Sequence, residues 1–196
     1  MAKAPENWDE RLANFCHEFY TRLGVQIPSP DTAADALSSG FEKSSNQTDK
    51  TNKDIALEWI GSSDADGRQT LLLQLYASIE FHIRASRKQI RDSISLARNM
   101  FHENEEAQLQ LDEISGKYEL FIDKSRGTPL PEDSAVLAFG QPDPERVIPG
   151  IEEQCAKLHN DVLAFENDLE EFFVLAEHFL SDDYKKRKPG SDKTLH

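Results

Sequence analysis

The sequence has few of the residues that build a disulfide-stabilised, secreted or membrane-embedded protein. It contains two cysteines in 196 residues, Cys16 and Cys155, whose separation fits neither a disulfide framework nor a metal-ligand spacing. No apolar stretch approaches the roughly 20 residues that a transmembrane helix needs. The first residues of the chain also lack the apolar core of a secretory signal. We therefore expect an intracellular protein, nuclear or cytoplasmic, that does not bind a membrane.

Positive charge is also scarce. The chain has 22 Lys and Arg residues against 36 Asp and Glu residues, which gives a formal net charge of −14. Phosphate groups would repel such a protein, so nucleic acid is disfavoured as a partner. Hydrophobic residues make up 38% of the chain and charged residues 30%. This polar composition predicts that part of the chain stays unfolded.

The sequence also lacks the motifs that carry chemistry. Its nine glycines form no phosphate-binding loop, and none of its histidines follows an acidic residue by three positions, as a carboxylate-bridged metal site requires. His102 and Glu106 share a helical face, but such a pair is an ordinary surface contact. Cys155 and Cys16 fall on or beside apolar stripes, where a cysteine acts as a small hydrophobe. We expect no catalytic residue, no metal and no cofactor, and we expect that the protein is not an enzyme.

Helical periodicity, by contrast, is abundant. The first amphipathic segment has a single apolar stripe at spacings of three and four residues, made of Trp8, Leu12, Phe15, Phe19 and Leu23. Gly24 provides a left-handed C-terminal cap, and Pro28 and Pro30 prevent continuation. This helix is a candidate docking helix, which either folds back onto the rest of the protein or enters a groove of a partner.

A polar stretch follows the first helix. Residues 25–53 are rich in Ser, Thr, Asp, Asn and Lys and predict a flexible linker. A short helix is expected at Ile55–Ile60, capped by Thr51 or Asn52 and ended by Gly61. Asp66 is then expected to be the N-cap of the next helix.

The next periodic segment is unusually long. Apolar residues keep near-helical spacing from Arg68 to Ser125, over 58 residues, and a single helix of this length would extend about 87 Å. For a chain of this size we favour a break near Glu103 over one continuous helix.

The final helix has the strongest pattern. Pro149 suits the first turn of a helix, and the positions after it repeat with a heptad period that predicts a bundle or coiled-coil seam. The seam comprises Ile151, Cys155, Leu158, Val162, Phe165, Leu169, Phe172, Ala176 and Phe179. It serves either as an internal core or as an oligomer interface. Apolar residues widen it between Phe172 and Leu180, so we expect that end to be enclosed on more than one side.

Two basic clusters stand out against the acidic background. The first is a stripe on the long middle segment, made of Arg84, Arg87, Lys88, Arg91 and Arg98. Residues 152–171 of the final helix are acidic, which favours internal pairing of the two helices over an external acidic partner. The second cluster is a candidate nuclear-import signal, unless it only keeps the tail soluble, and it consists of Lys185, Lys186, Arg187 and Lys188.

These patterns predict an all-α protein, an elongated helical bundle or coiled-coil-like hairpin of about four helices with a disordered linker and C-terminal tail. The expected parts are an N-terminal amphipathic helix, a flexible linker, a helical bundle domain and a disordered basic tail, at residues 1–24, 25–53, 54–181 and 182–196. The leading hypothesis is a non-enzymatic protein-interaction module, an adaptor or a subunit of a complex, whose partners are proteins or a second copy of itself. The alternative is a nucleic-acid- or chromatin-associated protein that uses the two basic clusters.

Overall fold

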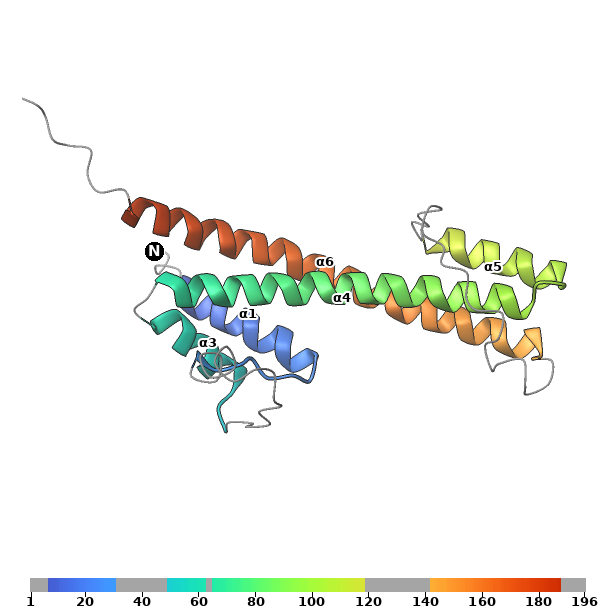
Figure 1. Cartoon of the computed structure of the whole chain (residues 1–196), viewed down its shortest axis with the longest axis horizontal. Helices are drawn as coiled ribbons and strands as arrows, with labels where there is room; N and C mark the ends of the chain where they lie inside the picture. Colours follow the sequence, from blue (N-terminus) through green and yellow to red (C-terminus); the bar gives the residue numbers. More distant parts are fainter. Residues whose placement is uncertain (1–6, 31–48, 63–64, 119–141, 188–196) are drawn as a thin grey trace, which may run out of the picture. The chain divides into compact units, whose positions relative to one another are not determined.

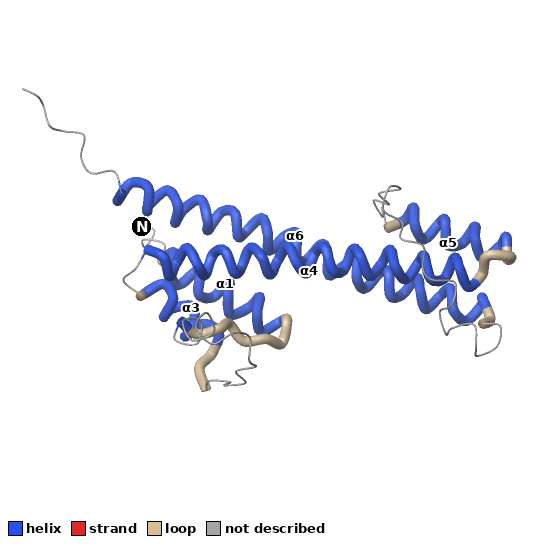
Figure 2. The backbone as a smooth tube through the Cα atoms, viewed as in Figure 1, coloured by secondary structure: helices blue, strands red, loops and turns tan. Residues whose placement is uncertain are grey.

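The computed structural model describes residues 7–30, 49–62, 65–118 and 142–187, and these residues are arranged almost entirely in helices (Figure 1). The described part of the chain contains no β-strand (Figure 2). The predicted all-α class is therefore confirmed. The helices are α1 (Trp8–Arg22), α3 (Asn52–Gly61), α4 (Ala65–Met100), α5 (Glu105–Lys117) and α6 (Pro144–Arg187).

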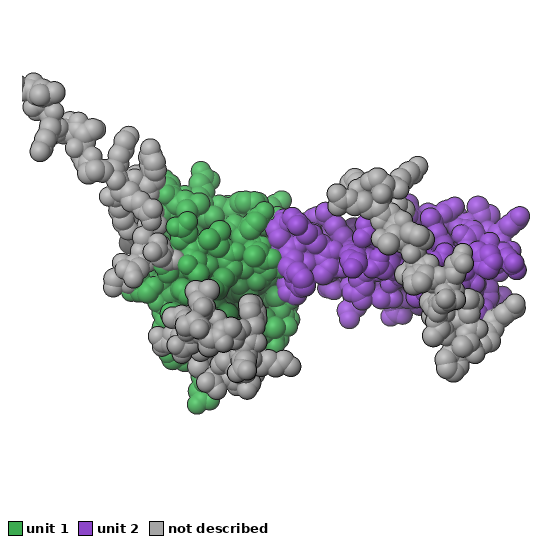
Figure 3. All heavy atoms as spheres, in the orientation of Figure 1, with its two compact units in different colours: residues 1–78, 168–196 green, residues 79–167 purple. Residues whose placement is uncertain are grey.

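The chain divides into two compact units (Figure 3). Unit 1 comprises residues 1–78 and 168–196, and unit 2 comprises residues 79–167. Unit 1 therefore contains α1, α3 and one segment of each long helix, and unit 2 contains α5 and the remaining segments of α4 and α6.

Helix α1 is capped at both ends. The side chain of Asn7 accepts a hydrogen bond from the amide of Glu10 at 3.3 Å, which satisfies one of the free amides of the first turn. Gly24 adopts a φ of 68°, and its amide donates to the carbonyl of Thr21 at 3.0 Å. Only glycine reaches this left-handed conformation without strain, so the predicted glycine cap is confirmed.

Helix α3 packs against α1 and confirms the helix predicted at Ile55–Ile60. Thr51 is its N-cap and forms a capping box with Asp54. The hydrogen bonds from Thr51 lower the pKa of Asp54 below its ordinary value. These hydrogen bonds favour the charged carboxylate, so the stability they contribute is present at neutral pH and falls in acid as Asp54 is protonated. The bond from the amide of Asp54 to the hydroxyl of Thr51 does not depend on this charge.

The segment after α1 is held by two side chains of α3. Asn52 is 8% exposed; its Oδ1 accepts from the amide of Ile27 at 2.8 Å and its Nδ2 donates to the carbonyl of Val25 at 3.0 Å. The indole of Trp59 donates to the carbonyl of Pro28 at 2.9 Å. The first residues of the predicted flexible linker, from Val25 to Pro28, are therefore held in place, because three hydrogen bonds fix their backbone.

A break separates α4 from α5, as predicted near Glu103. Helix α4 ends at Met100 and α5 begins at Glu105. Asn104 caps α5 by accepting from the amide of Ala107 at 3.0 Å. The side-chain amide of Gln108 donates to the carbonyls of Phe101 and Arg98, each at 2.9 Å. These bonds satisfy carbonyls at the end of α4 that a helix leaves free.

The core of unit 2 is formed by α4, α5 and α6. One buried apolar cluster joins them, and it fixes the turn between α4 and α5 by burying residues from both helices against the start of α6. Its members are Ile90, Ile94, Ala97, Phe101, Ala107, Leu111, Ile114, Ile148 and Cys155.

Three predicted helix boundaries need correction. Helix α6 begins at Pro144 rather than at Pro149, which lies inside the helix. The amides of Arg146 and Val147 donate to the carbonyl of Asp143 at 3.2 and 3.1 Å, so the helix is already established one turn earlier. Asp66 is the second residue of α4 rather than its N-cap. The helix α6 also continues to Arg187, beyond the predicted end at Ser181.

The disorder predicted for the linker and the tail falls mainly on residues 31–48 and 188–196, outside the described part of the chain. Ser125, the predicted end of the long middle segment, also lies outside it. None of the helices in the described ranges is long and apolar enough to cross a membrane.

Candidate functional site

Helices α4 and α6 run antiparallel in unit 1 and bury one shared seam. The guanidinium of Arg68 lies 4.8 Å from the ring centroid of Phe179, and the ring centroids of Tyr76 and Phe172 are 5.6 Å apart. Residue numbers thus rise on α4 as they fall on α6. The seam between the two helices is buried and consists of Leu72, Leu75, Phe172, Ala176 and Phe179.

One side of this helix pair is covered by α1. The hydroxyls of Tyr20 and Ser78 are 3.2 Å apart, which joins α1 to α4. Trp8 stacks on His178 with ring centroids 4.0 Å apart, which joins α1 to α6. Leu175 of α6 is fully buried. Helix α1, which packs against α3, therefore covers this side of the pair (Figure 1).

The opposite side of the same pair carries exposed apolar side chains. Tyr76 and Phe173 connect the two helices there, with ring centroids 6.3 Å apart. Leu73 precedes Tyr76 by three residues and Leu180 follows Phe173 by seven, so each shares a helical face with its neighbour. Because the helices are antiparallel, both leucines extend the surface in the same direction. We call this surface the apolar strip; its residues and their exposed fractions are Leu73 (61%), Tyr76 (38%), Phe173 (54%) and Leu180 (52%).

Acidic side chains border the apolar strip on α6. Glu170 and Glu177 are both exposed and, seven residues apart, lie on one face of the helix next to Phe173 and Leu180. Neither forms an ion pair within the described ranges. The nearby cation, Arg68, already binds Asp9 at 3.2 Å and covers the ring of Phe179. The border of the strip is therefore negatively charged.

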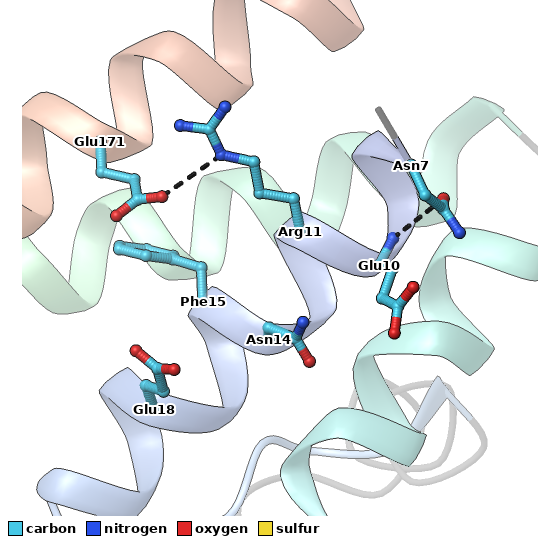
Figure 4. A pocket seen from close by; sticks show the side chains of 7 residues that line it. All are labelled: Asn7, Glu10, Arg11, Asn14, Phe15, Glu18 and Glu171. Carbon is cyan, nitrogen blue, oxygen red and sulfur yellow. Dashed lines mark hydrogen bonds and ion pairs between the residues drawn. The ribbon is translucent and has the colours of Figure 1, made fainter. Parts of the chain in front are cut away.

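Unit 1 also has a hollow between α1 and α6. It has a volume of about 350 Å³, and in it Arg11 of α1 reaches Glu171 of α6 at 3.4 Å over the ring of Phe15 (Figure 4). Glu10 and Glu18 also line it. Its charged groups are Arg11 and the carboxylates of Glu10, Glu18 and Glu171, and its lining contains no histidine or cysteine.

The two cysteines lie in the cores of the two units. Both thiols are fully buried. Burial raises the pKa of Cys16 to about 12, and burial followed by the charge of Glu152 raises the pKa of Cys155. A thiol with a raised pKa carries little thiolate near neutral pH, and the thiolate is the nucleophile.

We expect both thiols to resist alkylation in the folded protein. At pH 8, the rate with a thiol reagent should be roughly a hundredfold or more below the rate in urea, because both access and thiolate fraction are low. Absorbance of the released chromophore gives the rate, and Cys155→Ser isolates the reaction of Cys16. Reaction of either thiol at its unfolded rate would contradict the structure.

The predicted seam and docking-helix residues are buried or half-buried. Within unit 1, Leu12, Phe15 and Phe19 are buried, whereas Trp8 and Leu23 are half-buried. The seam of α6 is buried or half-buried at every predicted position in both units. The structure therefore uses both stripes for intramolecular packing. The widened end of the seam meets α4 and α1, but Phe173 and Leu180 stay exposed there.

The predicted basic stripe lies in unit 2, and its arginines face carboxylates of the same chain. Arg87 pairs with Glu166 of α6, as the internal-pairing interpretation predicts, whereas Arg98 pairs with Asp112 of α5. Arg84 lies 2.8 Å from Glu80, and Arg91 lies 3.9 Å from Asp92. Lys88 is exposed. Of the candidate import signal, Lys185, Lys186 and Arg187 belong to the last turns of α6, and Lys188 lies outside the described residues.

Sequence reasoning did not identify the apolar strip. Each of its members directly follows a buried seam residue, which gives the apolar pairs Leu72-Leu73, Leu75-Tyr76, Phe172-Phe173 and Phe179-Leu180. Such pairs indicate an apolar surface beside the buried face, since a helix that is apolar on its buried face only would have a polar residue at the second position.

Comparison with protein-family models, curated proteins and solved structures finds no match to this chain. The apolar strip is thus known from the geometry of this protein alone. Within the described residues, no group of three or more His, Cys, Asp or Glu side chains is arranged to hold a metal ion.

Proposed function

We propose that the protein is a non-enzymatic helical interaction module that binds another protein through unit 1. The observation that supports this proposal is the apolar strip. Four large apolar side chains stay between 38% and 61% exposed on two adjacent helices, and no described element covers them. Contiguous apolar surface of this kind is costly in water and marks interaction sites.

The position of the strip favours a binding role over a local packing defect. An antiparallel helix pair has two sides, and in unit 1 α1 covers one of them through aromatic and polar contacts. The exposed side carries the same kinds of side chain as the covered one. A partner helix on the strip would cover this side of the pair as α1 covers the other side.

The alternative, a nucleic-acid-associated function, has less support. It depends on a free basic stripe, but Arg87 and Arg98 are each paired with a carboxylate of a neighbouring helix. These pairs lower the positive potential that would attract a phosphate backbone. The proposal assigns no catalytic group, since the buried thiols have raised pKa values.

The binding role can be tested with matched variants of the full chain. Phe173→Glu places a charge in the apolar strip, and Leu163→Glu makes a comparable change at an exposed leucine of α6 in unit 2. We expect polypeptides captured by the tagged protein from extracts of its own organism to fall roughly tenfold or more for Phe173→Glu. They should be retained by Leu163→Glu. Quantitative mass spectrometry gives the ratios.

Unchanged helical circular dichroism in both variants shows that the fold is intact. If the two variants and the unmodified protein capture the same polypeptides in the same amounts, the apolar strip is not the binding surface and the proposal is wrong.

A further inference from the structure

We infer that the apolar strip binds a basic amphipathic helix of another protein. This inference rests on the proposed function and adds the chemistry of the partner. Two observations support it: the negative charge of the border formed by Glu170 and Glu177, and the length of the apolar strip along α6.

The charge of the border selects a cationic partner. Glu170 and Glu177 flank the exposed side chains of Phe173 and Leu180, and no described cation neutralises either carboxylate. Arg68, the basic residue of the neighbouring α4 segment, is held by Asp9 and by the ring of Phe179. A partner with Lys or Arg beside its apolar residues would pair with the free carboxylates, whereas an acidic partner would meet like charge.

The shape of the strip selects a helix. Phe173 and Leu180 are seven residues apart, which corresponds to roughly 10 Å along α6, and Leu73 and Tyr76 lie parallel to them on α4. Apolar anchors at i, i+3 or i+4, and i+7 of an incoming helix match this length. Helix α1 shows the same arrangement on the opposite side of the pair, where it contacts both α4 and α6.

The same border disfavours a second copy of the chain. Two copies that meet through the apolar strip about a twofold axis would bring two sets of Glu170 and Glu177 to one interface. Like charges across an interface are destabilising. The strip offers no basic residue of its own to compensate for them.

The test uses two fluorescein-labelled helical peptides of about 18 residues that share one leucine face. In one peptide the remaining positions are lysine, and in the other they are glutamate. Fluorescence anisotropy with the full-length protein should show at least about tenfold tighter binding of the lysine peptide. Phe173→Glu should weaken this binding by a similar factor. Glu170→Lys/Glu177→Lys should reverse the preference.

The charge-matched control is Glu113→Lys/Glu153→Lys, which changes the net charge equally at two exposed positions of unit 2. It should keep the preference for the lysine peptide. If it abolishes the preference as fully as Glu170→Lys/Glu177→Lys does, total charge rather than the border selects the peptide and the inference is overturned.

Other outcomes separate this inference from the proposed function. Equal binding of both peptides, lost with Phe173→Glu, would retain the strip as a binding surface and overturn the basic partner. A dimer in sedimentation velocity that Phe173→Glu dissociates would identify a second copy as the occupant and likewise overturn it. No binding of either peptide would overturn the inference, and only the capture experiment would then bear on the proposed function.

Discussion

Replacing Asn52 with alanine is expected to lower the free energy of unfolding by about 2–4 kcal/mol. Asn52 is buried and bonds to two backbone groups of the segment after α1. Its removal leaves the amide of Ile27, a residue only 2% exposed, without an acceptor. A buried donor that loses its partner costs its full desolvation free energy. Urea denaturation followed by circular dichroism measures the loss.

The neighbouring Thr51→Ala provides the comparison. Thr51 lies at the same helix start but is exposed, and its role is confined to the capping box with Asp54. Loss of such a cap costs about 1 kcal/mol. If Asn52→Ala were no more destabilising than Thr51→Ala, the hydrogen bonds to Val25 and Ile27 would contribute little, and the segment after α1 would be held by Trp59 and the burial of Ile27 alone.

The helices themselves were largely predictable, because their signals are local. The stripe of α1, the glycine after it and the apolar period of α4 each depend on residues within a few turns. The break after Met100 was also predictable, since a continuous helix would be too long for the chain to bury. The start of α6 was not, because Pro149 satisfies the rule for a first-turn proline as well as Pro144 does.

The role of Asn52 could not be predicted from the sequence. An asparagine just before an apolar run is typical of an N-cap, and that interpretation accounts for its position completely. Its actual partners lie 25 and 27 residues earlier in the chain. Their proximity depends on how α1 and α3 pack, which no local pattern encodes.

The apolar strip was missed for a related reason. The residues selected by the heptad period of α6 are buried or half-buried. The period does not tell which apolar neighbours of these residues stay exposed, because a helix buried on a wide face has the same sequence pattern. Which of the two sides is covered depends on where α1 packs. The contacts of Trp8 with His178 and of Tyr20 with Ser78 place α1 on one side, and the other side stays exposed.

The adjacent phenylalanines of α6 are expected to respond very unequally to the same substitution. Phe172 is 6% exposed and packs on Tyr76 within the seam, whereas Phe173 is 54% exposed. Phe172→Asp removes a buried ring and places a carboxylate in its site, so unit 1 should lose about 4 kcal/mol or more. Phe173→Asp should cost much less, about 1 kcal/mol, because it loses only a partly exposed ring and meets the like charges of Glu170 and Glu177, as urea denaturation of both variants will show.

This contrast would separate the core from the proposed binding surface within two consecutive residues. Phe172→Leu serves as a control, because it keeps an apolar side chain in the seam and should retain most of the stability that Phe172→Asp loses. Equal destabilisation by the two aspartate variants would mean that Phe173 is also buried in solution, and the apolar strip would then be part of the core. If the expected difference is found, Phe173→Asp is a folded variant in which only the apolar strip is changed. It can then be used to test binding separately from the stability of the fold.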